Sequence, residues 1–105
     1  MDRPLQDAIH HITNQLVEKY RPEQIILFGS AVRGDWQADS DVDFLAIKRE
    51  CPPSGRERIR ALQRLIRRNV AVDVLVYRPE EVAERLALGD PFLAAILREG
   101  KVLYG

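Results

Sequence analysis

The sequence predicts an α+β (α/β) fold in which a single mixed β-sheet is flanked by helices. Three observations support this class: apolar residues at helical spacing near the start, short β-branched runs, and helix-start signals between and after those runs. The length of 105 residues predicts a single domain covering residues 1–105. Such a domain has its own core but no room for a separate substrate-binding domain.

Helices are predicted from apolar periodicity and from residues that start or stop helices. The first runs from about Pro4 to Lys19. The second covers Arg56 to Arg68, with its apolar residues directed inward and its arginines outward. Two more follow, one from Pro79 to Leu88 and one from Pro91 to Gly100, each opened by a proline.

Strands are predicted where β-branched and aromatic residues form short runs. These runs are Ile25 to Phe28, Asp41 to Lys48, Val70 to Tyr77 and Lys101 to Tyr104. Residues 30–34 are long enough for one helical turn, and residues 35–40 form a polar loop. The edge of the last strand would allow a second copy to pair, so a homo-oligomer is compatible with this pattern.

The charges sum to zero, with 16 basic and 16 acidic residues, but they are unevenly placed. Thirteen of the basic residues are arginine, and six of these lie between Gly55 and Arg68. Four aspartates lie between Asp35 and Asp43. A net charge of zero argues against general nucleic-acid binding. The arginine-rich helix is either a solvated surface or a surface for an acidic partner or a polyphosphate.

Location is predicted from what the chain contains. Cys51 is the one cysteine, which suits a reducing compartment. The longest apolar run, Phe92 to Leu97, is too short to cross a bilayer, and the first residues lack the apolar core of a signal peptide. We therefore expect a cytoplasmic protein without a membrane partner.

Carboxylates mark the chemistry of the second strand. Asp41 and Asp43 are two residues apart, so in a strand they point to the same side, roughly 7 Å apart. Asp73 interrupts the apolar run of the third strand. If these strands are neighbours, three carboxylates meet on one face, an arrangement that suits one or two Mg²⁺ ions with substrate phosphates.

Gly29 and Ser30 supply a phosphate-binding turn before these acids. Glycine lets a ligand approach the backbone, Ser30 can cap the turn and donate its hydroxyl, and Arg33 adds guanidinium donors. A P-loop is excluded because Asp35 and Trp36 stand where lysine and serine or threonine are required. A Rossmann motif is excluded because residue 31 is alanine.

The segment from Ile25 to Tyr77 resembles the DNA polymerase β-like nucleotidyltransferase superfamily. Gly29-Ser30, ten residues and then Asp41-x-Asp43 match its G-S-x10-D-x-D signature, and Asp73 matches its later strand aspartate. At this length the chain looks like the minimal nucleotidyltransferases, commonly the antitoxins of helical HEPN-type ribonuclease toxins. The resemblance implies that Asp41, Asp43 and Asp73 are catalytic metal ligands, and that Gly29, Ser30 and Arg33 bind the nucleotide.

This resemblance implies a Mg²⁺-dependent enzyme that transfers AMP from ATP to a hydroxyl. The expected acceptor is a tyrosine of a partner HEPN-type toxin, which the modification would silence. Two alternatives remain: a non-catalytic antitoxin that neutralises a toxin by binding it, and a transferase acting on a small molecule or an RNA end.

Each candidate residue also has a plainer interpretation. Asp41 and Asp43 would be a solvated loop end, and Asp73 a buried acid paired with an arginine. Ser30 would be only a helix cap, and Arg33 would pair at the surface with Asp35 or Asp39. Trp36 would be either an exposed contact residue or an anchor for its loop.

Overall fold

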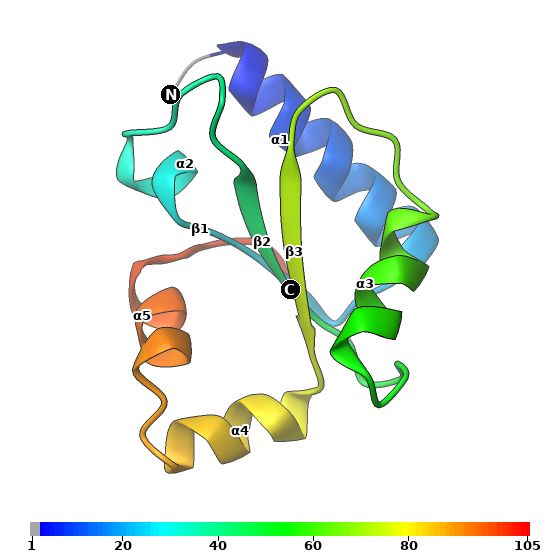
Figure 1. Cartoon of the computed structure of the whole chain (residues 1–105), viewed down its shortest axis with the longest axis vertical. Coiled ribbons are helices and arrows are strands. Elements are labelled where there is room, and N and C mark those ends of the chain that lie inside the picture. The colour runs from blue at the N-terminus through cyan, green and yellow to red at the C-terminus, as the bar shows by residue number, and fades with distance from the viewer. Residues whose placement is uncertain (1–2) are drawn as a thin grey trace.

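The computed structural model describes residues 3–105, which form a four-stranded sheet with helices on both faces (Figure 1). In chain order the elements are α1 (Arg3–Gln15), η1 (Leu16–Tyr20), β1 (Gln24–Phe28), α2 (Ser30–Arg33), β2 (Val42–Ile47), α3 (Gly55–Gln63), β3 (Val72–Tyr77), α4 (Pro79–Ala87), α5 (Pro91–Glu99) and β4 (Lys101–Tyr104). None of the helices in this described part has the length and apolar character that crossing a membrane requires.

The sheet has the strand order β3-β2-β1-β4 and is mixed, as predicted. β1 runs antiparallel to both β2 and β4, whereas β2 and β3 are parallel. The parallel register places Asp43 beside Asp73, and the antiparallel register places Asp43 beside Phe28. Asp43 in β2 therefore has β1 on one side and β3 on the other.

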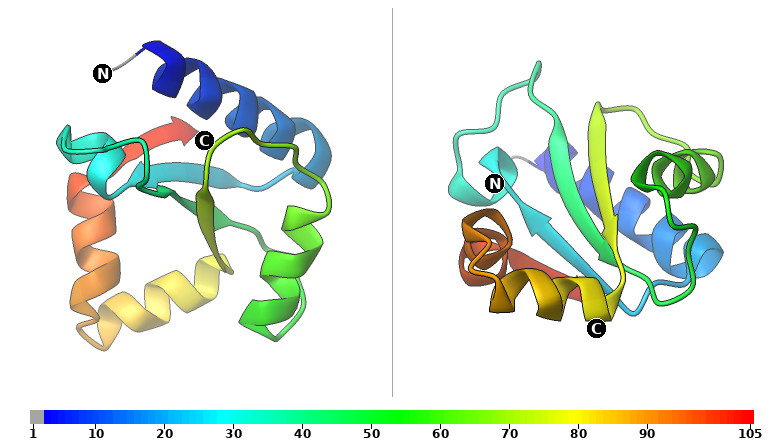
Figure 2. Two further views of the ribbon diagram at one scale, coloured as in Figure 1. Left: turned by 45° about the horizontal axis from the view of Figure 1, so that its top comes forward. Right: turned by 60° about the horizontal axis from the view of Figure 1, so that its bottom comes forward.

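Alternating residues divide the sheet into two unlike faces. The closed face packs against α1 and α3 and contains a wholly buried core that includes Phe44, Val74 and Leu62. The open face packs against α4 and α5 through Leu45, Leu93 and their neighbours, and it also carries Asp43 and Asp73. Figure 2 shows α1 and the pair α4–α5 on opposite sides of the strands.

The last two helices follow their sequence signals closely. Pro79 opens α4, and Asp90 caps α5 by accepting hydrogen bonds from the backbone N–H groups of Phe92 (2.9 Å) and Leu93 (3.3 Å). Gly100 ends α5 and leads directly into β4. These bonds satisfy donors that a helix start otherwise leaves free, and they lower the pKa of the Asp90 carboxyl.

The first helix continues further than its α-helical part. α1 ends at Gln15 and a π-helical turn, η1, extends the helix to Tyr20, one residue beyond the predicted Lys19. Arg21 then adopts a left-handed conformation (φ 56°), and its N–H bonds back to the carbonyl of Leu16. This conformation terminates the helix, as expected from the Tyr20-Arg21-Pro22 sequence.

The prediction for residues 56–68 was wrong in two respects. The helix α3 ends at Gln63, because the chain turns at Arg64 and carries Ile66 into the core as part of a loop. Arg58 points inward rather than outward and is 3% exposed. Its guanidinium forms a two-bonded ion pair with Glu81 of α4 (2.7 and 3.1 Å) and donates to the carbonyl of Val76 (3.1 Å). Arg58 therefore joins the helix layers on the two faces around the β3 edge.

Candidate active site

A sharp turn at the end of β1 begins the site. Gly29 has φ +79° and occupies the position before the first residue of α2, where its carbonyl accepts hydrogen bonds from Val32 and Arg33 (3.1 Å each). Ser30 was expected to cap this turn, but the capping position is Gly29 and no side-chain capping bond is present. Ser30 is partly buried, and its side chain makes no capping bond.

Gly29 is required here for a second reason besides its backbone conformation. A β-carbon at this position would collide with Oδ2 of Asp43 on the neighbouring strand. The main chain of the turn therefore lies directly against the carboxylate. The sequence predicted that glycine lets a ligand approach the backbone at this end of β1, and the contact of the turn with Asp43 is a separate finding.

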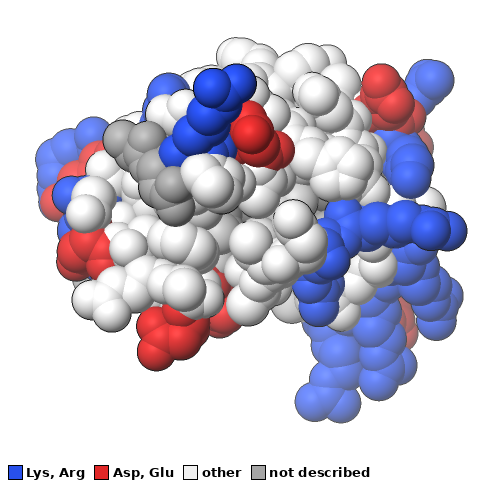
Figure 3. All heavy atoms as spheres, turned by 90° about the horizontal axis from the view of Figure 1, so that it is seen from above, with Lys and Arg blue, Asp and Glu red and all other residues white. Residues whose placement is uncertain are grey.

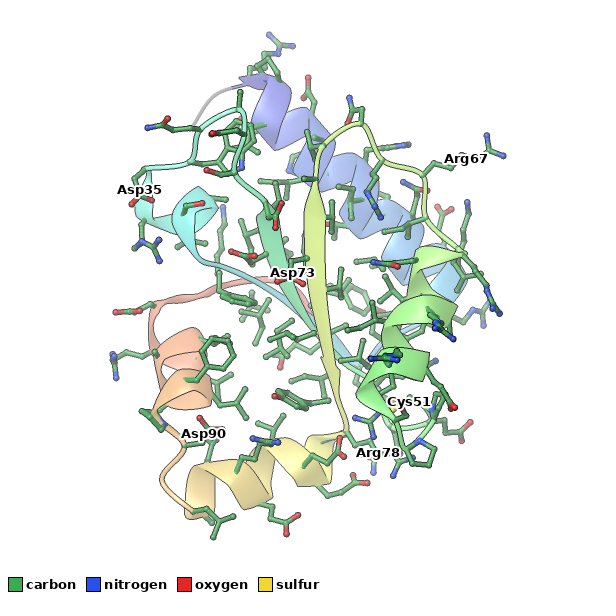
Figure 4. All side chains as sticks on the ribbon, viewed as in Figure 1. Asp35, Cys51, Arg67, Asp73, Arg78 and Asp90 are labelled. Atoms are coloured by element: carbon green, nitrogen blue, oxygen red, sulfur yellow. The ribbon has the colours of Figure 1, made fainter. Side chains whose placement is uncertain are left out.

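The structure brings two of the three predicted carboxylates together as direct neighbours. Asp43 of β2 and Asp73 of β3 are paired in the parallel register, so they share the open face about 4.8 Å apart in strand spacing. Asp41 lies just before β2 and is exposed. Asp73 is also exposed, so the alternative of a buried, arginine-paired acid does not hold (Figure 4).

The electrostatics of Asp43 reflect this crowding. Burial, followed by the negative charges of Asp73 and Asp41, raises the pKa of the Asp43 carboxyl above its usual value, while Arg33 lowers it. Two carboxylates beside a half-buried third repel one another unless a cation compensates their charge. The site therefore stores an unfavourable interaction that a bound cation would relieve.

Arg33 stands one turn beyond Gly29 on α2. Its Nε lies 3.6 Å from Oδ2 of Asp35, and both side chains are more than 60% exposed. An ion pair that open is weak and readily exchanged. The surface pairing considered from the sequence is thus present, and Arg33 stays close enough to influence Asp43.

A cavity of about 330 Å³ opens beside these residues. One wall comes from the β1–α2 turn and Asp43, and the other from α5. Its lining residues are Phe28, Gly29, Val32, Arg33, Asp43, Phe92, Ala95, Ile96 and Glu99. The rings of Phe28 and Phe92 meet edge to face, with centroids 6.0 Å apart. The cavity thus combines an apolar wall with three charged residues, Arg33, Asp43 and Glu99.

The wall formed by α5 was not predicted. Phe92 and Glu99 lie far along the chain from the Gly29–Asp43 segment and reach it only because α5 folds back beside α2. No spacing within the sequence marks that contact. Phe92 is half exposed in the structure, as is Leu97 to a lesser extent in the same apolar run, and nothing in the sequence distinguishes the two.

Trp36 anchors the loop between α2 and β2. It is partly buried and packs against the core of the closed face, and its indole nitrogen is buried without a hydrogen-bond partner. Of the two interpretations considered, the loop anchor is the one found. The polar loop carrying Asp39 and Asp41 is thereby held at the strand ends.

A divalent cation at this site would find few protein ligands. Within residues 3–105 no three acidic, histidine or cysteine side chains are arranged to hold a metal ion on their own. Asp43 and Asp73 nevertheless offer adjacent carboxylates whose repulsion a hard cation would relieve. Such a set fits Mg²⁺ of the kind that takes few protein ligands and completes its shell with water and substrate phosphates.

A family model for the nucleotidyltransferase domain matches residues 9–104, nearly the whole chain. The chain belongs to the nucleotidyltransferase domain family. The match includes the Gly29-Ser30 turn, the carboxylates of β2 and β3, and α5. Family membership confirms the nucleotidyltransferase assignment predicted from the G-S-x10-D-x-D signature.

Two individual proteins resemble this nucleotidyltransferase. A protein of Methanocaldococcus jannaschii named "Putative protein adenylyltransferase" is 48% identical over 42 residues, covering 38% of this chain and 42% of that protein. A crystal structure of a "putative nucleotidyltransferase" from Sulfolobus solfataricus matches with a TM-score of 0.54 and 23% identity, covering 80% and 81% of the two chains. The second likeness confirms the fold.

Proposed function

We propose that this nucleotidyltransferase transfers AMP from ATP to the hydroxyl of a tyrosine on a partner protein, with Mg²⁺ as cofactor. The partner we propose is a HEPN-type ribonuclease toxin, so that the chain acts as its antitoxin, in the reducing cytoplasm that suits the lone Cys51. The observation that carries the proposal is the pairing of Asp43 with Asp73 beside the Gly29 turn.

The parts of the site divide between the two substrates. The turn at Gly29 and Ser30, with Arg33, supports binding of the triphosphate through backbone N–H groups, a hydroxyl and guanidinium donors. The cavity between Arg33 and Phe92 supports binding of the nucleoside, because its wall is apolar next to charge. Asp73 lies on the edge strand, where an acceptor has free access.

The proposed reaction transfers the AMP group of ATP to the tyrosine hydroxyl and releases pyrophosphate. The tyrosine oxygen attacks the α-phosphorus in line, a phosphorus–oxygen bond forms, and the bond to the bridging oxygen of pyrophosphate breaks. Asp73 is the carboxylate best placed to take the proton of the attacking hydroxyl. Asp41, Asp43 and Asp73, together with the substrate phosphates, would hold one or two Mg²⁺ ions, which would neutralise the phosphate charge.

What these residues contribute is position and charge rather than a covalent intermediate. Asp43 is fixed between β1 and β3, where burial and the charges of Asp73 and Asp41 raise the pKa of its carboxyl. Arg33 is held by only a weak surface pair and is therefore free to turn toward a phosphate.

The proposal is tested by mixing the protein with the product of the neighbouring gene, ATP and Mg²⁺, and measuring the mass of that product. We expect whole AMP units to be added on tyrosine, and to be lost with Asp43→Asn. Asp39→Asn, the same change in the exposed loop before β2, is the matched control and should leave transfer intact. An unmodified product would refute the transfer, and neutralisation in cells by Asp43→Asn would favour the non-catalytic antitoxin.

A further inference from the structure

A stripe of arginines covers the outer surface of α3 and the loop after it. Arg56, Arg60 and Arg64 follow one another at four-residue spacing, so they project from the same side of the helix, and Arg67 continues the stripe. All four side chains are exposed. Basic side chains gather on this side of the molecule in the view from above (Figure 3). We call these four residues the arginine stripe.

The arginine stripe has no ion-pair partner in the described part of the chain. The arginines that do form ion pairs within residues 3–105 are Arg33, Arg58, Arg85 and Arg98. Like charges four residues apart on a helix repel one another and slightly destabilise it. The stripe thus carries a small folding cost that an external acidic partner would compensate.

The main chain at the end of the stripe is fixed by a buried side chain. Gln15 of α1 is 8% exposed, and its amide makes two hydrogen bonds to the backbone of Arg67. The Gln15 nitrogen donates to the Arg67 carbonyl, and the Arg67 N–H donates to the Gln15 oxygen, both at 2.6 Å. These two hydrogen bonds hold the loop, so the main chain of Arg67 has a fixed position (Figure 4).

The arginine stripe lies near the β3 edge of the sheet, and β3 carries Asp73. The loop held at Arg67 leads straight into β3, and β3 is an edge strand that carries Asp73. The nucleotide cavity lies on the other side of Asp43, between α2 and α5. The two substrates can therefore approach from different directions. The arginine stripe lies on the closed-face side of the β3 edge, and Asp73 lies on the open-face side of the same edge strand.

We infer that the arginine stripe is the docking surface for an acidic face of the acceptor protein, which it holds so that the tyrosine reaches Asp73. This inference rests on the proposed function. Guanidinium groups match carboxylates with two parallel hydrogen bonds, which suits Asp- and Glu-rich surfaces. RNA fits less well, because residues 55–68 contain no aromatic side chain on which a base could stack and the net charge is zero.

The test uses a random copolymer of glutamate and tyrosine as the acidic probe. Its binding is measured by fluorescence anisotropy at about 0.15 M salt, where the screening length is about 8 Å. The variant Arg60→Glu/Arg64→Glu/Arg67→Glu should bind the copolymer at least about tenfold more weakly than the unchanged protein. The matched control Arg3→Glu/Arg98→Glu/Lys101→Glu changes the same number of exposed charges on α1, α5 and β4 and should bind normally.

Two more measurements separate the docking from the transfer. ATP binding by the triple-glutamate stripe variant should be unchanged, because the cavity lies away from the stripe, and this also checks that the variant is folded. Transfer of AMP to the copolymer should fall with its binding. Stripe-dependent docking without any AMP transfer would contradict the proposed function but leave the docking surface standing.

The inference is overturned by any of three results. One is that the unchanged protein does not bind the copolymer, and another is that the stripe variant and the control lose binding equally. The third is that polyuridylate binds the stripe more tightly than the copolymer does, which would assign the surface to RNA. A less drastic variant, with glutamine at the same three positions, should lose part of the affinity and guards against misfolding.

Discussion

The two faces of the sheet are built from alternate residues of the same strands, yet they serve different ends. On the closed face, Val42, Phe44 and Val74 are at most 2% exposed and contribute only packing. On the open face the same strands carry Asp43 and Asp73 at one end and apolar residues such as Leu45 at the other. The chain therefore places its tightest packing on the closed face and its carboxylates at one end of the open face.

The largest effect on stability should come from emptying the closed face. Phe44→Ala removes a ring with no exposed surface and should lower the free energy of unfolding by about 4 kcal/mol. Phe92→Ala, the same change beside the cavity on the open side, removes a ring that is half exposed and should cost less than about 1 kcal/mol. Urea unfolding of the two variants measures the difference, and equal losses would contradict the division between faces.

The second effect concerns the ion pair that joins the two helix layers. Arg58→Leu leaves Glu81 without its buried partner and should cost about 3 kcal/mol. Arg60→Leu, the neighbouring exposed arginine of α3, should change stability by less than about 0.5 kcal/mol. A similar midpoint of thermal unfolding for both variants would show that Arg58 does not hold the layers together.

The same ion pair predicts a dependence on pH. The hydrogen bond from Arg58 lowers the pKa of the Glu81 carboxyl, so ionised Glu81 stabilises the folded state. That contribution is present above the ordinary glutamate pKa and is lost as the pH falls through the lowered value. Glu81→Gln should therefore flatten this part of the acid unfolding curve, and an unchanged curve would contradict the assignment.

The third effect separates function from stability on the open face. Asp43→Asn should reduce AMP transfer more than about 100-fold, since removing even the outer partners of metal ligands costs 10–100-fold. The same change should stabilise the metal-free fold at neutral pH. The pKa of Asp43 is raised in the folded state, so ionisation there costs folding free energy as the pH rises through that range.

The measurement for Asp43→Asn is thermal unfolding at several pH values without Mg²⁺. The variant should be more stable than the unchanged protein at pH 7, and the difference should vanish below the ordinary aspartate pKa. Asp39→Asn is the control and should show no such pH dependence. A variant that is less stable than the unchanged protein at pH 7 would mean that Asp43 stabilises the fold rather than destabilising it.

The smallest effect compares two glycines on either side of α2. Both have positive φ, +79° at Gly29 and +91° at Gly34, but only Gly29 lies against a carboxylate. Gly34→Ala should cost about 1 kcal/mol for backbone conformation alone. Gly29→Ala should cost about 2 kcal/mol and also impair AMP transfer, because the new methyl displaces Asp43. Equal effects on transfer would contradict close contact between the turn and the carboxylate.

Much of this architecture could be predicted because its signals are local. The spacing of Gly29, Asp41 and Asp43, the prolines that open α4 and α5, and the cap at Asp90 each act within a few residues. Even the pairing of Asp43 with Asp73 followed once two strands were assumed to be neighbours.

The features that could not be predicted depend on distant contacts. In the sequence Arg58 resembles its exposed neighbours. Its burial depends on the ion pair with Glu81 of α4, which offsets the cost of removing the charge from water. The loop that follows the early end of α3 is held by hydrogen bonds between Gln15 and Arg67, which are 52 residues apart. The cavity wall at Phe92 depends on how α5 packs beside α2.

The most direct test of the central claim, that the carboxylates of the open face hold a divalent cation together with ATP, is calorimetric titration of ATP with and without Mg²⁺. In the unchanged protein we predict that Mg²⁺ strengthens ATP binding at least about tenfold, or about 1.4 kcal/mol. In Asp43→Asn we predict that Mg²⁺ makes no such difference, while Asp39→Asn behaves like the unchanged protein. ATP binding that is equally tight without Mg²⁺, or equally Mg²⁺-dependent in Asp43→Asn, would contradict the claim.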